Sequence, residues 1–291
     1  MQFAAILGHL LDGLLSGACY LLIALGLSLI FALGGIVNMA HGALYAVGAY
    51  LAMLVSYHLG APASVVIAPA LVALIGVAIE RLLFRRLDRA DPALPLLVTF
   101  ALAMVTEQAI RTTFRGAPWF EAVPGIAQGQ LLLGDFSYPI DRLVVLLVAV
   151  VVMTLTWLLI ERTPFGRVVR AGVQNPEMVG ALGIALAPYR LAMTAIGITL
   201  AGLAGALFAP IVTVHPAMGQ DVLSAAFVVV VIGGLGSFRG LATAALLVAL
   251  ARGLTAAFEP LAGDAAMYLL LVITVLLRPR GLFGAHEGER A

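Results

Sequence analysis

Residues 26–52 read GLSLIFALGGIVNMAHGALYAVGAYLA, two apolar runs separated by a glycine pair, an asparagine and a histidine. They lie within a longer segment, 13–79, that contains no Asp, Glu, Lys or Arg. About 20 apolar residues are enough for an α-helix to cross a bilayer, so one crossing cannot account for this segment. We expect three membrane-spanning helices here, at about 13–33, 42–59 and 63–83.

The whole chain has the composition of an integral membrane protein. Of its 291 residues 63% are hydrophobic and 11% are charged, whereas soluble domains carry roughly 25% charged residues. Further apolar segments lie at about 94–113, 142–160, 189–212, 241–258 and 265–277. The sequence therefore predicts one all-α polytopic membrane domain over 1–291, with about eight transmembrane segments that are broken or re-entrant at glycine-rich stretches.

The positions of the arginines predict the orientation of the chain in the membrane. The sixteen basic residues are all arginine, and eleven of them lie at 81–89, at 162–170 with Arg190, and at 278–290. Because cytoplasmic loops carry an excess of basic residues, we expect these clusters to be cytoplasmic. The N-terminus and the loops at 114–141, 213–221 and 259–264 are then external. Arginines dispersed in this way, with a net charge of +1, indicate no nucleic-acid partner.

The residue types that are missing exclude several activities. A P-loop needs a lysine to reach the nucleotide phosphates, and Schiff-base chemistry also needs one. The single Cys19 allows neither an internal disulfide nor a multi-cysteine metal site. The five histidines are scattered, without an HExxH motif. We therefore expect no catalytic site, no metal and no cofactor in this chain.

The break in the opening stretch is one candidate for a solute path. Unwound backbone at membrane depth is tolerated only where protein or a water-filled cavity surrounds it. Gly34 and Gly35 permit such a break, Asn38 and His41 offer polar groups, and Tyr45 follows one turn later. The two polar side chains could contact a polar solute. An equally good interpretation is that they form hydrogen bonds with the backbone groups that the break leaves unpaired.

A second break, GGLGS at 233–237, adds Gly233, Gly234 and Ser237 to the candidates. The apolar run that ends in this break, 227–237, is too short to cross a membrane. Both breaks follow an apolar run and precede an Ala/Leu-rich helix, a pattern typical of duplicated transporter halves. The sequence thus predicts an internal repeat, with chance similarity of apolar segments as the alternative. The glycines of LAGLAGALFA, at 202 and 205, predict close helix packing.

Glu107 is the carboxylate placed deepest in an apolar segment. Such a group is expensive in a membrane and is usually paired. An i,i+4 ion pair with Arg111 accounts for it. A role in the solute path or at the interface with a partner subunit is the alternative.

Residues 161–188, ERTPFGRVVRAGVQNPEMVGALGIALAP, form a polar stretch between two long apolar segments. Thr163 and Asn175 each precede a proline, which is a usual start of a helix. We expect short helices at 165–171 and 178–182, with Gly183 ending the second. Binding to lipid, docking to a partner protein and simple connection all fit these features.

Glu177-x5-Gly183 resembles the EAA loop of binding-protein-dependent ABC importers, although Met178 and Val179 replace its alanines. Four stretches in the same order look like the LivH permease family of branched-chain amino acid ABC importers, from about Leu10 to Arg280. They are GLSLIFALGGIVNMAHGALYAVGAYLA, RTPFGRVVRAGVQNPEMVGALGI, LAGLAGALFAP and FVVVVIGGLGSFRGLATAALLVAL.

This resemblance implies a permease that works with a LivM-like second permease, two ATP-binding subunits and a periplasmic substrate-binding protein, in the bacterial inner membrane. ATP would be bound by the partner subunits. Coupling to them would fall to Thr163, Gly166, Arg167, Arg170, Gln174, Asn175, Pro176, Glu177 and Gly183.

The expected substrate is a branched-chain or related hydrophobic amino acid. Urea, short amides and aromatic acids are alternatives, because importers of this type take their specificity mainly from the binding protein. An ion-coupled secondary transporter and a membrane scaffold or enzyme are competing classes. The scarcity of intramembrane acids argues against the first of these.

Overall fold

The computed structural model describes residues 2–35, 38–84, 93–114, 127, 129–133, 136–234, 236–279 and 281–283. Parts of the predicted arginine clusters (85–89, 280 and 284–290) and of the predicted external loop (115–126) lie outside the described residues. The helices are α1 (Gln2–Gly34), α2 (His41–Leu59), α3 (Ala61–Ile79), α5 (Ala93–Thr113), α6 (Ile140–Arg162), α7 (Pro164–Gln174), α8 (Pro176–Ala181), α9 (Ala187–Phe208), α10 (Met218–Gly233), α11 (Phe238–Phe258) and α12 (Gly263–Leu277). A π-helical turn, Glu80–Phe84, extends α3, a 3-10 turn, Pro260–Ala262, precedes α12, and strands β1 (Gln130–Leu133) and β2 (Phe136–Pro139) pair antiparallel.

Seven helices among the described residues are long and apolar enough to cross a membrane: α1, α2, α3, α5, α6, α9 and α11. Helices α10 and α12, with 16 and 15 residues, are apolar but shorter. The predicted all-α polytopic membrane fold is therefore confirmed, and the expected eight or so segments resolve into seven long helices and two short ones. Large apolar side chains are exposed along α3, α5, α6 and α12.

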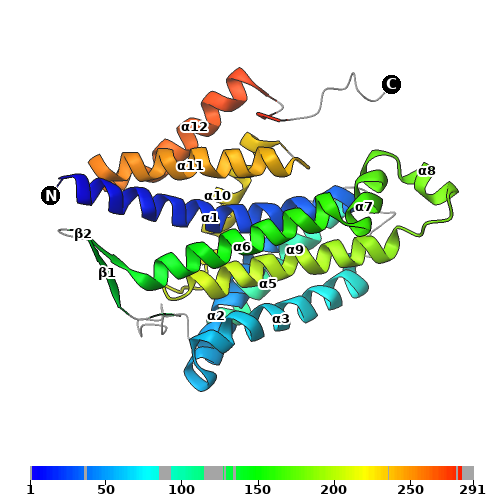
Figure 1. Cartoon of the computed structure of the whole chain (residues 1–291). Helices are drawn as coiled ribbons and strands as arrows, with labels where there is room; N and C mark the ends of the chain where they lie inside the picture. Colours follow the sequence, from blue (N-terminus) through cyan, green and yellow to red (C-terminus); the bar gives the residue numbers. More distant parts are fainter. Residues whose placement is uncertain are drawn as a thin grey trace.

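The bundle has two distinct ends (Figure 1). The N-terminus and the β1–β2 hairpin lie at one end, and α7 and α8 project from the other. We refer to them as the hairpin end and the α7/α8 end. Helix α1 runs from the hairpin end to the α7/α8 end, where Leu33 lies beside Gly172 of α7.

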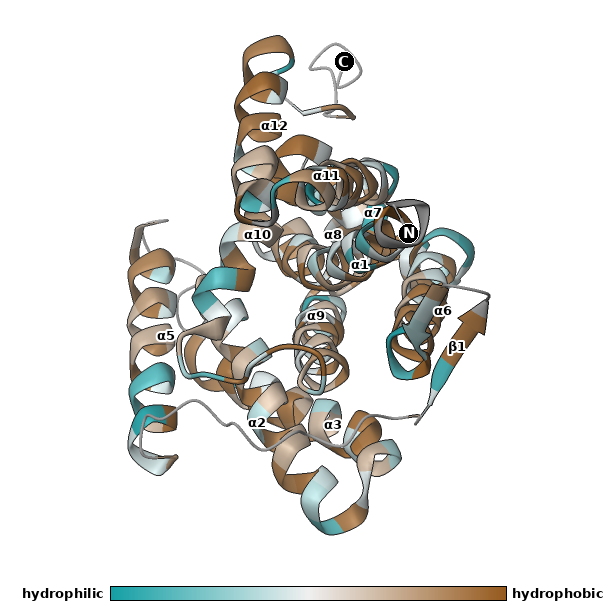
Figure 2. Cartoon of the chain, turned by 90° about the vertical axis from the view of Figure 1, so that its left-hand side faces the viewer, coloured by the Kyte–Doolittle hydropathy of each residue, from teal (hydrophilic) through white to brown (hydrophobic). Residues whose placement is uncertain are grey.

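Helix α9 occupies the centre of the bundle, surrounded by the other long helices (Figure 2). It packs against α1, α2 and α3, and its contacts with α1 and α2 include positions where both partners are glycine. Gly197 faces Gly26 of α1, and Gly202 faces Gly48 of α2. A Cβ atom added at Gly205 would overlap the backbone of Tyr45. The close packing expected at 202–205 is confirmed, because these glycines let the helix backbones approach directly.

The first break turns the chain back into the bundle. His41, the first residue of α2, lies beside Ile23, eleven residues before the end of α1. At 1.5 Å per residue, α2 therefore begins about 16 Å back along α1. The second break is tighter, since Gly233 at the end of α10 lies against Gly240 in the first turn of α11. Both are helix–break–helix units, and the internal repeat stays a prediction.

Several predictions about the elements were wrong. Helix α1 begins at Gln2 rather than near 13. The loop at 213–221 is shorter than expected because α10 begins at Met218, where Gly219 packs against Gly42 and fixes the start of the helix. Helix α9 ends at Phe208 rather than near 212, ahead of Pro210, which cannot continue the hydrogen-bond ladder. The external loop contains the β1–β2 hairpin, which the sequence analysis did not anticipate.

The hairpin is fastened to the start of α1. Tyr138 of β2 donates a hydrogen bond to Asp12 (2.8 Å), and Arg142 forms an ion pair with the same oxygen (2.5 Å). Burial raises the pKa of Tyr138, and the hydrogen bond to Asp12 raises it further, so the hydroxyl keeps its proton. These contacts hold the hairpin against the bundle.

Gly48→Ala should destabilise the bundle, because its new Cβ would overlap the backbone of Gly202. Overpacking of this kind typically costs about 1–3 kcal/mol. The measurement is the melting temperature of the purified protein in detergent. Gly8→Ala is the matched control, since no atom lies within 4 Å of its Cβ, and alanine favours a helix over glycine by about 1 kcal/mol. Equal shifts for both variants would contradict this packing.

Candidate functional site

Asn38 and His41 close the start of α2, and both are completely buried (0% exposed). The Asn38 side-chain oxygen accepts a hydrogen bond from the Ala40 N–H (3.0 Å), and His41 Nε2 lies 3.1 Å from the Ile23 carbonyl oxygen. The Met39 N–H donates to Thr99 Oγ1 of α5 (3.2 Å). These contacts satisfy backbone groups at the break, which is the structural role that the sequence analysis gave as the alternative to a solute path.

Each of these two side chains also keeps a nitrogen without a partner. Because a carbonyl oxygen only accepts, the hydrogen of His41 must sit on Nε2. Within the described residues, His41 Nδ1 and Asn38 Nδ2 then have no hydrogen-bond partner, although both atoms are buried. A buried polar atom without a partner costs about 1–3 kcal/mol, so the break retains unused polar capacity in the interior of the bundle.

The structure separates the other path candidates from this pair. Gly34 and Gly35 lie at the α7/α8 end, where a Cβ atom would meet nothing within 4 Å. Gly233 and Gly234 are buried beside α11 and the segment after α12, with Gly281 against Gly234. Ser237 caps α11 by accepting a hydrogen bond from the Gly240 N–H (3.0 Å).

Tyr45 lines a partly open cavity of about 400 Å³. The cavity lies among α1, α2, α9, α10, α11 and α12, and its polar lining includes Tyr20, Asp221, Arg252 and Asp264. Arg252 of α11 pairs with Asp264 of α12 through Nε and Oδ1 (3.0 Å) and donates to the Tyr20 hydroxyl of α1. Sequence reasoning missed this group, although an arginine inside the apolar segment 241–258 was a signal for it.

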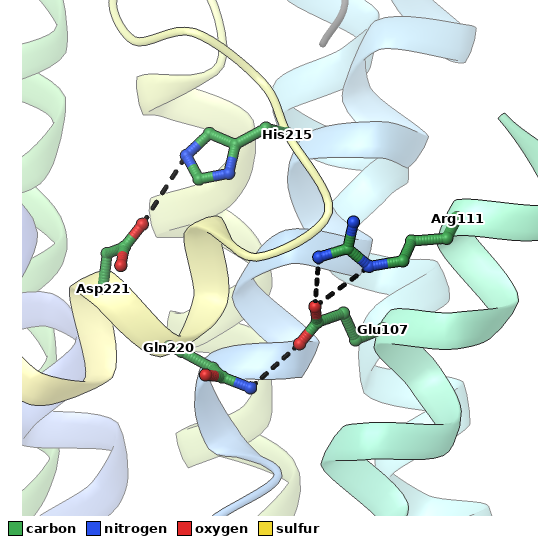
Figure 3. Close-up of polar contacts among 5 residues, drawn as sticks. All are labelled: Glu107, Arg111, His215, Gln220 and Asp221. Atoms are coloured by element: carbon green, nitrogen blue, oxygen red, sulfur yellow. Dashed lines mark hydrogen bonds and ion pairs between the residues drawn. The ribbon is translucent and has the colours of Figure 1, made fainter. Parts of the chain in front are cut away.

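Glu107 joins α5 to α10 (Figure 3). One carboxylate oxygen accepts from Arg111 Nη2 (2.6 Å) and Nε (3.1 Å), and the other accepts from Gln220 Nε2 of α10 (2.9 Å). The expected i,i+4 ion pair with Arg111 is therefore present, and the carboxylate makes a second contact that the sequence did not reveal. Nearby, His215 Nε2 lies 3.6 Å from Asp221 Oδ2. A narrow cavity between α5 and α10 borders Glu107 and Gln220.

Helix α7 is bound tightly to the end of the bundle. Thr163 caps it by accepting from the Gly166 N–H (3.2 Å), as predicted. Arg170 donates to the Ile160 carbonyl oxygen and lies 3.4 Å from the Glu161 carboxylate. Gly172 lies between Leu33 of α1 and Leu186. Arg170 thus contacts α6, whereas Arg167 on the same helix is exposed.

Helix α8 projects beyond the bundle and packs against α7 (Figure 1). Asn175 caps it by accepting from the Met178 N–H (2.9 Å), and Gly183 follows it with φ +79°, as expected of a helix stop. Glu177 is exposed in its first turn. Met178 and Leu182 expose 58% and 72% of their surfaces. Gln174 and Pro176 are exposed as well, so the capped pair presents a mixed polar and apolar surface.

Residues 9–277 match the family described as branched-chain amino acid transport system, permease component. This chain belongs to that family. The match covers the bundle from α1 through α12 and includes both breaks and the α7–α8 pair.

Individual relatives are similar over almost the whole chain. The high-affinity branched-chain amino acid transport system permease protein BraD of Pseudomonas aeruginosa is 27% identical, over 98% of this chain and 97% of its own length. LivH of Escherichia coli K12, which carries the same descriptive name, is 26% identical over 99% of each chain. LivM of the same organism is 27% identical over 94% of this chain and 72% of its own length. No solved structure shows significant similarity.

Asn175→Ala should loosen α8 without unfolding the bundle. The variant removes the side-chain acceptor for the Met178 N–H, a loss that typically costs about 1 kcal/mol and corresponds to roughly fivefold faster opening. Hydrogen–deuterium exchange over 176–182 measures it, with the exchange of α7 as internal reference. Asn175→Asp keeps an acceptor and should exchange like the unmodified protein. Unchanged exchange in the alanine variant would show that the cap does not hold α8.

Proposed function

We propose that this chain is a permease subunit of an ABC importer for branched-chain or related hydrophobic amino acids. ATP is bound and hydrolysed by two separate subunits, which dock at the α7/α8 end. A LivM-like permease completes the membrane domain, and a periplasmic binding protein delivers the solute at the hairpin end. The complex lies in the bacterial inner membrane, with α7 and α8 in the cytoplasm.

The projecting α8 is the observation that carries this proposal. Its packing is against α7, and it exposes Met178 and Leu182 beside the carboxylate of Glu177. Exposed apolar side chains ringed by polar ones favour a protein partner. Since the chain has no lysine, an ordinary P-loop must come from another subunit. Helix α7 connects this surface directly to α6 and α1.

The solute path, in this proposal, runs from the hairpin end past Tyr45 to the break at the start of α2. Tyr45 borders the large cavity, and His41 lies one helical turn further along α2. In the present conformation the break is closed by Asn38 and His41. Their two unpartnered nitrogens become available to a polar solute when α2 moves relative to α1.

The names of the relatives favour branched-chain amino acids over the other substrates. BraD and LivH are both named as branched-chain amino acid permeases, and their similarity extends over nearly the whole chain. Urea, short amides and aromatic acids are the second choice, because the binding protein of such importers selects the solute.

Glu177→Ala and Gly183→Val should uncouple ATP hydrolysis from transport. The first removes the exposed carboxylate of α8, and the second places a side chain where φ is +79° and strains the end of the helix. We expect solute uptake by the reconstituted complex to fall more than tenfold, while permease abundance and ATPase activity persist. Uptake and phosphate release are measured on the same proteoliposomes.

Thr243→Ala is the control, since this exposed side chain of α11 donates its hydroxyl hydrogen to carbonyl groups of its own helix. It should leave uptake unchanged. The proposal is overturned if the chain alone, without ATPase subunits, transports solute when an ion gradient is the only driving force. A proton-dependent current that Glu107→Gln abolishes would instead support an ion-coupled transporter.

Asn38→Leu and His41→Leu should slow transport more than tenfold, because both remove the polar groups at the break. Ser56→Ala in α2 is the control, since it likewise removes a buried polar group, here a hydroxyl that has no partner among the described residues. Uptake is compared at equal amounts of folded complex, judged by melting temperature. Full uptake in both leucine variants would contradict the path assignment.

A further inference from the structure

The 400 Å³ cavity bordered by Tyr45 carries charges of both signs. Arg252 supplies the cation, and Asp221 and Asp264 supply two carboxylates. The rest of its wall is mixed, with Ser224 among the polar residues and Phe208 and Met267 among the apolar ones. Small-molecule sites typically have volumes of about 300–1,000 Å³ and combine an apolar wall with a few placed polar groups.

The guanidinium of Arg252 is held in a fixed position. Its Nε forms an ion pair with Asp264 Oδ1 (3.0 Å), Nη1 donates a hydrogen bond to the Tyr20 hydroxyl, and its centre lies 5.6 Å from the centroid of the Tyr20 ring. The ion pair and the hydrogen bond together engage two of its five N–H groups. Three donors of a pre-oriented fork therefore stay available, and this is the geometry that suits a carboxylate.

The two acidic side chains that line the cavity are also accessible. Asp264 exposes 65% of its side chain, and its carboxylate has further acceptor sites beyond the one that Arg252 uses. Asp221 of α10 exposes 70% and lies 3.6 Å from His215. Both carboxylates can therefore accept hydrogen bonds from an ammonium group.

A purely structural role does not account for this combination. A clamp between α11 and α12 needs one arginine and one aspartate, and the Arg252–Asp264 pair already provides it. It needs neither a second carboxylate nor an open volume. An arginine inside an apolar helix, such as Arg252 in α11, is costly and usually marks a water-filled cavity or a solute path.

We propose that this cavity binds the zwitterion of an α-amino acid that has an apolar side chain. Arg252 binds the carboxylate, Asp264 and Asp221 bind the ammonium group, and the side chain lies against Phe208 and Met267. This inference rests on the proposed function and extends it, because it gives the permease a solute site of its own. The pairing of charges also separates an amino acid from urea, which has no charge, and from an acid without an amine.

The position of the cavity suits a site that receives solute from the hairpin end. Ser16 and Tyr20 line it one and two turns after Asp12, the residue of α1 that contacts the hairpin. Tyr45 borders it one turn beyond the His41 closure on α2. A bound amino acid would therefore lie next to the break, on the side of the hairpin end.

The test uses the purified complex in nanodiscs, with its partner permease and ATPase subunits but without binding protein. Binding is measured for leucine, for 4-methylpentanoate, which lacks the amine, and for 3-methylbutylamine, which lacks the carboxylate. We expect leucine to bind at least tenfold more tightly than either analogue. Arg252→Gln should weaken leucine and 4-methylpentanoate about tenfold and leave 3-methylbutylamine unchanged. Asp264→Asn should weaken leucine and the amine, and leave the acid unchanged.

Both charge variants also remove the α11–α12 ion pair, so a further variant keeps the test decisive if they fail to fold. Ser224→Trp fills the cavity and leaves Arg252 and Asp264 in place, and it should abolish binding of all three ligands. Thr243→Trp, at an exposed position of α11 outside the cavity lining, is its matched control and should bind like the unmodified complex.

The inference is overturned if 4-methylpentanoate or 3-methylbutylamine binds as tightly as leucine, if no ligand binds, or if Ser224→Trp leaves leucine binding intact. ATPase co-purification and uptake driven by the binding protein are measured separately. They stay intact if only the zwitterion site fails, and they are lost if the proposed function itself fails.

Discussion

The contact between His41 Nε2 and the Ile23 carbonyl oxygen is the interaction on which the position of α2 in this bundle depends. It fixes the start of α2 in the interior rather than at the end of α1. That placement is possible because Gly26 leaves room for the imidazole and Gly42 leaves room for the backbone of α10. A backbone break inside a membrane protein must have its polar groups satisfied by protein or water. Here Asn38 and His41 supply those groups, so the proposed closure of the path and the stability of the fold depend on the same side chains.

The outer elements depend on this centre through contacts between backbones. Helix α9 approaches α1 and α2 at glycine pairs, where side-chain adjustment cannot absorb a displacement. Helix α7 is bonded to the last carbonyl groups of α6 and packs on Leu33 of α1. A force applied at α8 therefore reaches the end of α1 through rigid elements. Interfaces that pack this closely shift between discrete arrangements rather than deform continuously.

Much of this architecture could be predicted from local sequence. The helices follow from long apolar runs, and the two caps at Thr163 and Asn175 follow from hydrogen bonds within three residues. The start of α10 could not be predicted in this way, because Gln220 and Asp221 look like loop residues until Gly219 is placed against Gly42. The hairpin was overlooked for a different reason. Its apolar runs around Gly134-Asp135 carry a turn signal, which the polar composition of the loop obscured.

In the candidate site, too, contacts between residues close in sequence were predictable and contacts between distant residues were not. Glu107 and Arg111 are neighbours in sequence and their pairing was predictable, whereas the Gln220 contact joins residues 113 positions apart. Likewise, Tyr20, Arg252 and Asp264 belong to three helices, and their meeting follows from the packing of α1 on α11 and of α11 on α12. An arginine that looks isolated in an apolar segment thus lines a cavity together with two carboxylates. Because this cavity and the His41 closure share α2, any movement of α2 that opens the break also reshapes the wall that Tyr45 forms. Occupancy of the proposed site and the state of the break are therefore linked through one helix.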